Sequence, residues 1–337
     1  MVSARAARVA VLGAGSWGTA LAILLGRNGH RVALWGRDAA AMKAMSESRR
    51  NTRYLPEAEI PQGVTSTADL KSALDHAGIV LVVVPSRAFR GILEQLAREC
   101  PSPLELVWAT KGFDPASGSL LHQVAEEILP AGSKLAVLSG PTFAAEIAAA
   151  LPAAVTIAST DDEFAARMAR LFHNPRFRAY TSDDIVGVQT AGAVKNVLAV
   201  AAGIADGLGF GANTRAALIT RGLAEIVRLG VALGGRQETF MGLAGLGDLV
   251  LTCTDNQSRN RRFGLALATG LSVEDAVASV GQVVEGAETT RQAMRAGERL
   301  GVELPIVEQV YRVIYDNCPP LEAVGALLTR PRSQEGA

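Results

Sequence analysis

The sequence carries no excess charge of either sign. Its 337 residues contain 33 Lys and Arg against 33 Asp and Glu, so the formal net charge is zero. A protein that binds nucleic acid usually presents a basic face, and this balance gives no bulk electrostatic support for one. We therefore expect no nucleic-acid partner, and any basic patch must be local.

Cysteine and histidine are scarce. The three cysteines, Cys100, Cys253 and Cys318, are odd in number and far apart, which favours free thiols in a reducing compartment over a disulfide framework. The four histidines lack the spacing of metal ligands, and neither a GxSxG motif nor a cysteine-nucleophile context is present. We expect no metal cofactor and no hydrolase built on a serine or cysteine nucleophile.

Long uninterrupted apolar runs are missing as well. The basic N-terminus leads into an apolar run at residues 9–12, which is too short for a signal peptide. The most apolar longer stretch, 186–205, contains Gln189, Lys195 and Asn196, whereas a membrane span needs roughly 18–20 uninterrupted apolar residues. We expect a soluble cytoplasmic protein without a membrane span.

The first half of the chain alternates short apolar runs with amphipathic stretches. Leucine and valine fill every position of 81–84, which suits a central strand buried on both faces. The alternation predicts an α/β domain with a doubly wound (Rossmann) parallel sheet. The expected strands cover residues 8–13, 31–36, 78–85, 104–112, 134–141 and 153–159.

Strand signals end with the segment 177–184, and only helical patterns follow. The expected helices cover about 183–207, 214–233, 246–253, 258–269, 285–300, 305–317 and 320–329. The sequence therefore predicts two domains, an α/β domain over 1–182 and an all-helical domain over 183–330, with a frayed tail at 331–337.

A glycine motif, GAGSWG at 13–18, lies between the first expected strand and a helix. Glycines there allow a tight turn and a close approach of the backbone to a pyrophosphate, which the helix N-terminus then binds. The motif alone could be a glycine-rich turn without a ligand. Its position between a strand and a helix, with a second strand at 31–36, favours a dinucleotide-binding domain.

The end of the second expected strand reads Trp35-Gly36-Arg37-Asp38. An acidic residue at this place selects NAD, whereas an arginine accommodates the 2′-phosphate of NADP. Arg37 is nearest to the expected position, and Asp38 suits the cap of the next helix. We expect NADPH to be preferred and NAD to be accepted. A solvated surface Arg37 is the alternative interpretation.

Two lysines are candidates for chemistry. Lys195 lies within TAGAVKNVLAVAAG (190–203), an apolar helical pattern that offers it no acidic partner within one turn. An arbitrary lysine in such a helix would extend its head group to water, which is the alternative here. Lys111 follows a strand, at the carboxyl end where open α/β sheets bind their ligands.

A third cluster lies in the segment 242–264 of the helical half. Asp248 and Thr252 are four residues apart and share a helix face. The string Ser258-Arg259-Asn260 opens the next helix, where hydroxyl, amide and guanidinium groups suit a phosphate monoester. A charged surface is the alternative for the adjoining arginines.

With these motifs in place, the chain resembles the bacterial NAD(P)-dependent glycerol-3-phosphate dehydrogenases from about residue 8 to 328. The segment GAVKNVLAVAAG (192–203) matches the family signature around its catalytic lysine. Further matches follow the family's order along the chain, and they are GSWGTALA, WATKG, SGPTFAAEI, GLAGLGDL with SRN, and VVEG.

The resemblance implies a role for each matching residue. Lys195 would be the general acid/base, with Asn196 beside it. The substrate would contact Lys111, Gly140, Thr142, Lys195, Asp248, Ser258, Arg259 and Asn260. The cofactor would contact Ser16, Trp17, Arg37, Tyr54, Lys111, Ala144, Arg259, Val283 and Glu285. Tyr54 lies in a stretch, 48–63, that we expect to be irregular.

The implied reaction interconverts dihydroxyacetone phosphate and sn-glycerol 3-phosphate and supplies glycerophospholipid synthesis. Two other functions stay open at this point. One is a related reductase whose keto or hydroxy acid substrate carries a carboxylate, and the other is a dinucleotide sensor without catalysis. A homodimer and a monomer also both stay open.

Overall fold

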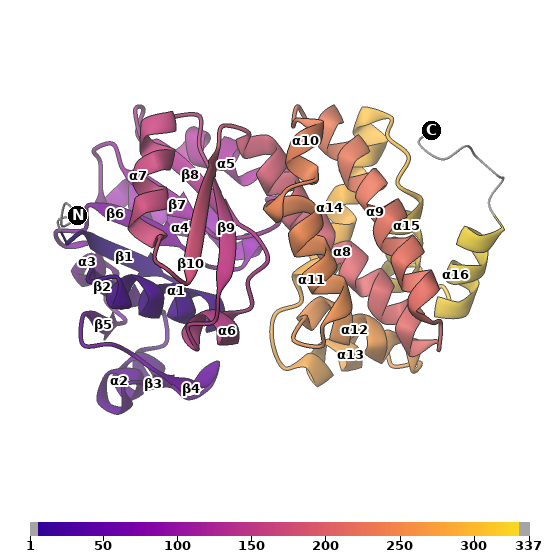
Figure 1. Ribbon diagram of the computed structural model, residues 1–337, viewed down its shortest axis with the longest axis horizontal. Coiled ribbons are helices and arrows are strands. Elements are labelled where there is room, and N and C mark those ends of the chain that lie inside the picture. Colours follow the sequence, from indigo (N-terminus) through magenta and orange to yellow (C-terminus); the bar gives the residue numbers. More distant parts are fainter. Residues whose placement is uncertain (1–5, 330–337) are drawn as a thin grey trace. The chain divides into compact units, whose positions relative to one another are not determined.

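The computed structural model describes residues 6–329, and the chain folds as two compact units. The first ends at Gln189 and contains both strands and helices, whereas the second begins at Thr190 and is helical (Figure 1). This confirms the predicted fold class. The units divide inside a long helix, α8 (Ile185–Gly207), a few residues after the expected boundary. The expected frayed tail at 331–337 lies outside the described residues.

Within residues 6–329, eight strands of the first unit form one sheet, and each segment predicted as a strand contributes to it. In spatial order the strands are β10 (Phe177–Ser182), β9 (Ala153–Ala158), β8 (Lys134–Ser139), β7 (Glu105–Trp108), β6 (Ile79–Val82), β1 (Arg8–Leu12), β2 (Arg31–Trp35) and β5 (Val64–Thr67). The edge strand β5 was not predicted. It pairs with β2 in parallel, so that Val32 lies opposite Val64.

One pair departs from the predicted parallel sheet, because β9 runs antiparallel to β8. A parallel return needs a crossover element long enough to cover the sheet. The connection between these strands contains only the short helix α6 (Ala144–Ala148), which packs against α1 (Ser16–Arg27). The prediction of a fully parallel sheet was therefore wrong at this pair.

The central strands are buried on both faces, as the apolar run at 81–84 predicted. Leu81 and Val107 belong to the core that contains the apolar residues of α1 and of α7 (Asp162–Phe172). Trp108 points to the opposite face, where its ring meets the edge of Phe89 from α4 (Ser86–Glu99) at 5.9 Å between centroids. Alternate residues of one strand thus fill two different layers.

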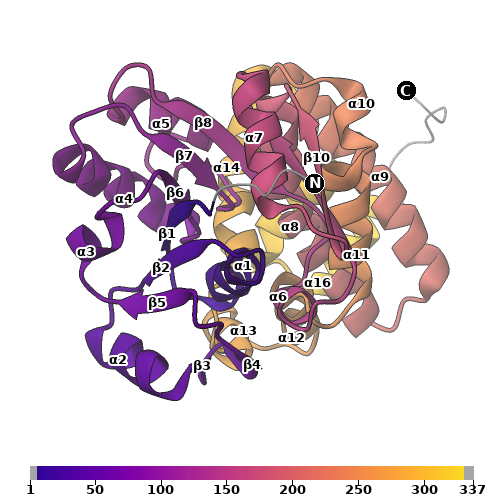
Figure 2. The same ribbon diagram turned by 60° about the vertical axis from the view of Figure 1, so that its left-hand side comes forward.

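The first unit contains further short elements besides the sheet and the helices named above. They are the helices α2 (Ala39–Ser48), α3 (Leu70–Leu74) and α5 (Leu121–Ile128), and the antiparallel hairpin β3 (Arg50–Asn51) and β4 (Leu55–Glu59). The hairpin, which lies next to α2 in Figure 2, replaces the irregular stretch expected at 48–63. Arg49, directly before β3, holds the end of this segment by donating to the carbonyl oxygens of Ile60 and Val64.

The second unit contains the long helices predicted for it and three short elements that were not predicted. The predicted set comprises α8, α9 (Ala212–Ala232), α11 (Asp248–Thr254), α12 (Arg259–Ala268), α14 (Glu285–Leu300), α15 (Pro305–Tyr315) and α16 (Pro320–Leu328). The additional elements are α10 (Gln237–Phe240), a π-helical turn η1 (Leu243–Gly247) and α13 (Val273–Val280).

Helix α8 is long and apolar enough to cross a membrane by length and composition. However, 94% of its most apolar 18-residue window is buried in the folded chain. Such burial is typical of the core helix of a globular protein, so the helix gives no support for a membrane span.

Helices α8 and α12 touch through their backbones. A Cβ atom added at Gly203 would overlap the carbonyl oxygen of Arg261, and one added at Gly264 would overlap that of Val200. Since only glycine permits this approach, the two helices are held at a fixed close distance. This contact positions the N-terminal turn of α12 beside α8.

Candidate functional site

The glycine motif forms a tight turn between β1 and α1. Gly13 has φ +122°, and a Cβ atom there would overlap the carbonyl oxygen of Val83. A Cβ atom at Gly18 would overlap the carbonyl oxygen of Gly13, so the turn and the helix pack without side chains. At Gly15 an added Cβ would meet no protein atom within 4 Å. The open side of Gly15 at the start of α1 thus fits a phosphate group.

Asn51 connects this turn to the β3–β4 hairpin. Its buried amide Nδ2 donates to the carbonyl oxygen of Ala14 at 3.0 Å and to Oγ1 of Thr19 at 2.7 Å. Its Oδ1 accepts from the backbone N–H of Tyr54 at 3.2 Å. The half-buried Tyr54 is therefore held close to the glycine turn. Sequence reasoning missed Asn51, because nothing in its neighbourhood predicts a contact 32 residues away.

The other residues expected around the cofactor in this unit lie at the same end of the sheet. Ser16 and Trp17, both half-buried, form the first turn of α1. Arg37 follows β2 and is exposed to solvent. Asp38 caps α2, with Oδ1 accepting from the N–H of Ala41 at 3.0 Å, which confirms the cap predicted for it.

Lys111 follows β7 at this same edge. Since β1, β6, β7 and β8 run parallel, their carboxyl ends lie together. Lys111 is half-buried, between Thr110, whose Oγ1 donates to the carbonyl oxygen of Val84 at 2.8 Å, and Gly112, which has φ +129°. The hydrogen bond of Thr110 thus anchors the chain directly before Lys111.

The segment after β8 carries the SGPTF motif. Gly140 is buried, and a Cβ atom there would lie 3.0 Å from the carbonyl oxygen of Ala154 on β9. Thr142 donates from Oγ1 to the carbonyl oxygen of Gly140 at 3.2 Å, and the half-buried Ala144 begins α6. These residues lie at the edge of the sheet that also carries Lys111.

In the helical unit, Lys195 is buried rather than extended to water. Its side chain is 7% exposed, and its ammonium Nζ forms an ion pair with Oδ1 of Asp248, whose side chain is 2% exposed. Nζ also donates to Oγ1 of Thr252 at 2.8 Å. Burial disfavours the charged ammonium, whereas the adjacent carboxylate stabilises it. The acidic partner that α8 does not provide comes from α11.

Asp248 and Thr252 lie on one face of α11, as their spacing predicted. The hydroxyl of Thr252 donates to the carbonyl oxygen of Asp248 at 2.6 Å while it accepts from Lys195. The π-helical turn η1 immediately precedes Asp248, and a Cβ atom at its Gly245 would overlap the backbone of Phe240. Turns of this kind are frequent at functional sites, and this one sets where α11 begins.

A second set of contacts joins α8, α12 and α14. Asn260 donates from Nδ2 to Oδ1 of Asn196 at 2.9 Å, and its own Oδ1 accepts from the N–H of Gly286 at 2.9 Å. Val283 and Glu285, both half-buried, lie at the start of α14 beside this contact. The structure thus connects Asn196 and Asn260 directly, although their sequence positions are 64 residues apart.

Ser258 and Arg259 form the N-terminal end of α12. Ser258 caps the helix, with Oγ accepting from the N–H of Arg261 at 3.2 Å, and the half-buried Arg259 is its first residue. Arg261 is only 7% exposed, so the interpretation of these arginines as a surface patch is wrong for this residue. Its guanidinium pairs with Asp206 of α8 and donates to the carbonyl oxygen of Cys253 at 3.2 Å.

The thiol of Cys253 lies close to these charges but is itself buried. Burial raises the pKa of Cys253 to about 12, against the opposing effect of Lys195 and Arg261. The thiol therefore stays protonated near neutral pH and contributes no nucleophile. Among residues 6–329, no three His, Cys, Asp or Glu side chains are arranged to hold a metal ion.

Two family models together match nearly the whole chain. The model described as the N-terminus of NAD-dependent glycerol-3-phosphate dehydrogenase matches residues 8–165, and the model of its C-terminus matches residues 184–325. A glycerol-3-phosphate dehydrogenase [NAD(P)+] from Thioalkalivibrio sulfidiphilus is 59% identical over 97% of this chain and 98% of its own length.

A solved structure of a glycerol-3-phosphate dehydrogenase is also similar to this chain. The crystal structure of glycerol-3-phosphate dehydrogenase from Coxiella burnetii is 45% identical, with a TM-score of 0.94 over 96% of this chain and 99% of that one. A ketopantoate reductase from Ralstonia eutropha is 18% identical, with a TM-score of 0.59 over 94% of this chain and 99% of that one, which shows a shared fold alone. The chain belongs to the NAD-dependent glycerol-3-phosphate dehydrogenase family.

Proposed function

We propose that the protein interconverts dihydroxyacetone phosphate and sn-glycerol 3-phosphate with a nicotinamide dinucleotide, and so supplies glycerophospholipid synthesis. Family membership supports the reaction, and the buried group formed by Lys195, Asp248 and Thr252 is the observation that carries it. A buried ammonium with a defined orientation is suited to transfer a proton to or from a reacting oxygen.

Lys195 acts as the general acid/base in this proposal. An ammonium has three N–H donors, and the contacts with Asp248 and Thr252 direct two of them. In this proposal the oriented ammonium gives its proton to the C2 oxygen of the substrate, which gains negative charge during reduction. Asp248 keeps the amine charged until that moment, and Lys195 takes the proton back in the reverse reaction. General acid catalysis of this kind typically contributes about 10²–10⁴-fold to the rate.

The chain also provides a fitting place for the cofactor. When bound, the nicotinamide supplies or accepts the hydride. The open side of Gly15 and the first N–H groups of α1 receive the pyrophosphate. The proposed contacts around it are Ser16, Trp17, Arg37, Tyr54, Lys111, Ala144, Arg259, Val283 and Glu285.

NADPH is the preferred form of the cofactor in this proposal, with NADH accepted less well. The exposed Arg37 lies two residues after the end of β2, where a 2′-phosphate would bind. Asp38, the nearby acid that could select NADH instead, already uses its carboxylate to cap α2. The side chain next to the ribose is therefore a cation.

The substrate phosphate binds at the N-terminal end of α12. Arg259 offers a charge-assisted pair, and the Ser258 hydroxyl can donate to an anion while its oxygen caps the helix. Asn260 completes this set, and Lys111, Gly140 and Thr142 are proposed to line the glycerol part. Removal of the arginine leaves a buried anion without its partner, which is costly.

An assay of near-ultraviolet absorbance tests the proposal, since only the reduced nicotinamide absorbs there. The purified protein should oxidise NADPH with dihydroxyacetone phosphate and fail with ketopantoate and other keto acids. Arg259→Ala should lose about 10²-fold or more in kcat/KM with dihydroxyacetone phosphate and far less with unphosphorylated dihydroxyacetone. Preferred turnover of a keto acid, or cofactor binding without any turnover, would contradict the proposed reaction.

We also propose that the protein is cytoplasmic. Cys100, Cys253 and Cys318 are free thiols, which suits an enzyme of a reducing cytoplasm. Light scattering of the purified chain decides between a homodimer and a monomer.

A further inference from the structure

The loop that carries Lys111 is a built structure rather than a loose connection. Phe113 and Leu120 pair as an antiparallel bridge at its base, and Phe113 is 1% exposed. Inside the loop, the N–H of Asp114 donates to the carbonyl oxygen of Ser119 at 2.9 Å, and that of Gly118 donates to Asp114 at 2.8 Å. Asp114 lies at the centre of these contacts.

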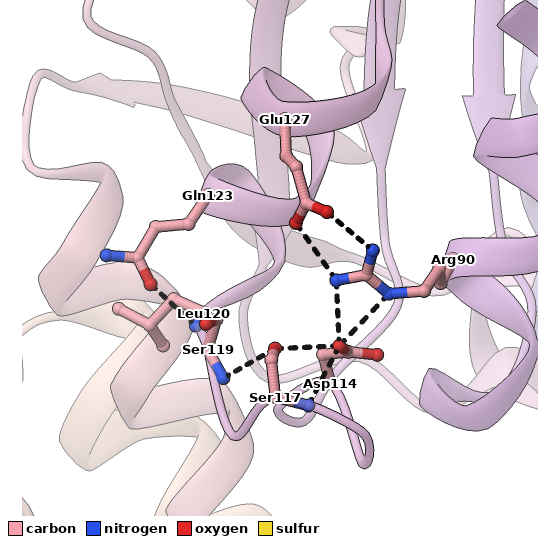
Figure 3. A network of polar contacts seen from close by, with 7 residues as sticks. All are labelled: Arg90, Asp114, Ser117, Ser119, Leu120, Gln123 and Glu127. Carbon is pink, nitrogen blue, oxygen red and sulfur yellow. Dashed lines mark hydrogen bonds and ion pairs between the residues drawn. The ribbon is translucent and has the colours of Figure 1, made fainter.

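The carboxylate of Asp114 gathers donors from inside and outside the loop. Its Oδ2 accepts from the N–H and Oγ of Ser117 at 3.2 and 2.7 Å, and from Nε and Nη2 of Arg90 at 3.2 and 3.1 Å (Figure 3). The side chain is 4% exposed. Burial opposes the charged carboxylate, yet the hydrogen bonds from Ser117 and Arg90 hold the pKa of Asp114 below its usual range.

Arg90 connects three elements through one guanidinium. It belongs to α4, it contacts Asp114 in the loop, and it forms a two-pronged pair with Glu127 of α5 at 3.0 and 3.1 Å (Figure 3). The two carboxylates differ in their surroundings, since the Glu127 side chain is 61% exposed. An exposed ion pair contributes little to stability, whereas removing one partner of a buried pair is costly.

We propose that Arg90 and Asp114 are positioning residues for Lys111, an inference that rests on the proposed function of that lysine. Only two residues separate Lys111 from Asp114: Gly112, in a conformation that favours glycine, and the buried Phe113. The buried Phe113 and its bridge to Leu120 restrain this short segment, so we expect a displacement of Asp114 to move the Lys111 backbone. A misplacement of about 1 Å can cost about 10²-fold in rate.

The substitution Asp114→Asn tests whether Asp114 positions Lys111. Glu127→Gln is the matched control, because Glu127 is the exposed carboxylate that pairs with the same guanidinium. Hydrogen exchange of residues 109–120 should rise at least about tenfold in Asp114→Asn and stay unchanged in the control. In turnover of dihydroxyacetone phosphate, Asp114→Asn should lower kcat more than it raises KM, by about tenfold or more. Glu127→Gln should stay within about threefold of wild type.

A double-mutant cycle with Lys111→Ala separates positioning from general stabilisation. If Asp114 acts through Lys111, Asp114→Asn should change the rate of the Lys111→Ala enzyme by less than about threefold. Equal effects in both backgrounds, or unchanged exchange in the loop, would overturn the inference. Should Asp114→Asn not fold, Arg90→Lys replaces it. Lysine keeps the positive charge but cannot form the two-pronged contacts of the guanidinium, and the same exchange and rate measurements apply.

The outcome is distinguishable from a failure of the proposed function. A wild-type protein without turnover of dihydroxyacetone phosphate would refute the reaction. The exchange measurement would still decide whether Arg90 and Asp114 fix the loop. An active wild type whose turnover does not respond to Lys111→Ala would refute both the role of Lys111 and the positioning inference.

Discussion

Asp248→Asn removes one charge from the buried pair with almost no change of shape. The side chains of Lys195 and Asp248 are 7% and 2% exposed, so neither charge can be stabilised by bulk water. Asparagine can still accept a hydrogen bond, but it removes the counter-charge that Asp248 supplies to the ammonium. Breaking a buried pair by removing one partner typically destabilises a protein by about 3–5 kcal/mol.

The cost should depend on pH, because an unpaired amine can release its proton. Starting from an ordinary lysine pKa of about 10.4, release costs about 4.6 kcal/mol at pH 7 and about 1.9 kcal/mol at pH 9. The cheaper of the two outcomes, an unpaired charge or a neutral amine, limits the loss of stability. In the variant the unfolded chain binds more protons than the folded one, so its stability rises with pH relative to wild type.

Calorimetry of Asp248→Asn at the two pH values provides the measurement. At pH 7 the melting temperature of the helical unit should fall by roughly 6–20 °C, and at pH 9 by less than about half of that. Asp255→Asn is the control, since this aspartate ends the same helix and its carboxylate accepts from the local N–H of Gln257 at 2.7 Å. Equal losses at both pH values, or a loss no larger than that of the control, would refute the reasoning.

Three further predictions follow from the site. Lys195→Arg should lower kcat by about 10²–10⁴-fold with little change in cofactor affinity, because guanidinium does not release its proton; retention of more than about a tenth of the turnover would contradict a proton-transfer role. Arg37→Ala should raise KM for NADPH about tenfold and leave KM for NADH nearly unchanged, whereas equal changes would make Arg37 an ordinary surface residue. Cys253, whose pKa burial raises to about 12, should resist iodoacetamide in the folded protein at mildly alkaline pH and react after unfolding. Mass spectrometry detects the label, and rapid labelling of the folded chain would show that the thiol is accessible.

Local patterns were sufficient to predict most of the fold. The apolar run at 81–84 and its counterparts correspond to real strands, and the Asp248–Thr252 spacing places both side chains on one face of α11. Short elements were not predicted from the sequence, because they are too short to show a periodic pattern of apolar residues. The strand β5 has four residues, and the π-helical turn η1 depends on how Gly245 packs against Phe240.

The site was harder to predict, because its contacts join distant segments. Lys195 was identified as unusual from its apolar surroundings, but its partner lies 53 residues further along the chain. No sequence pattern around α8 specifies that the counter-charge comes from α11. No local pattern predicts the role of Asn51 either. It contacts the glycine turn from the segment 48–63, which was expected to be irregular.

The backbone contact between α8 and α12 also sets the distance between Lys195 and Arg259. Lys195 and Gly203 belong to one helix, and Gly264 and Arg259 belong to the other, so the glycine contact fixes how far the proposed proton donor is from the proposed phosphate ligand. Exchanging core side chains should not adjust this spacing, because at Gly203 and Gly264 the two helices meet backbone to backbone. Directed evolution toward substrates with a longer chain between ketone and phosphate should therefore succeed through insertions at 255–257, before α12, rather than through substitutions inside either helix.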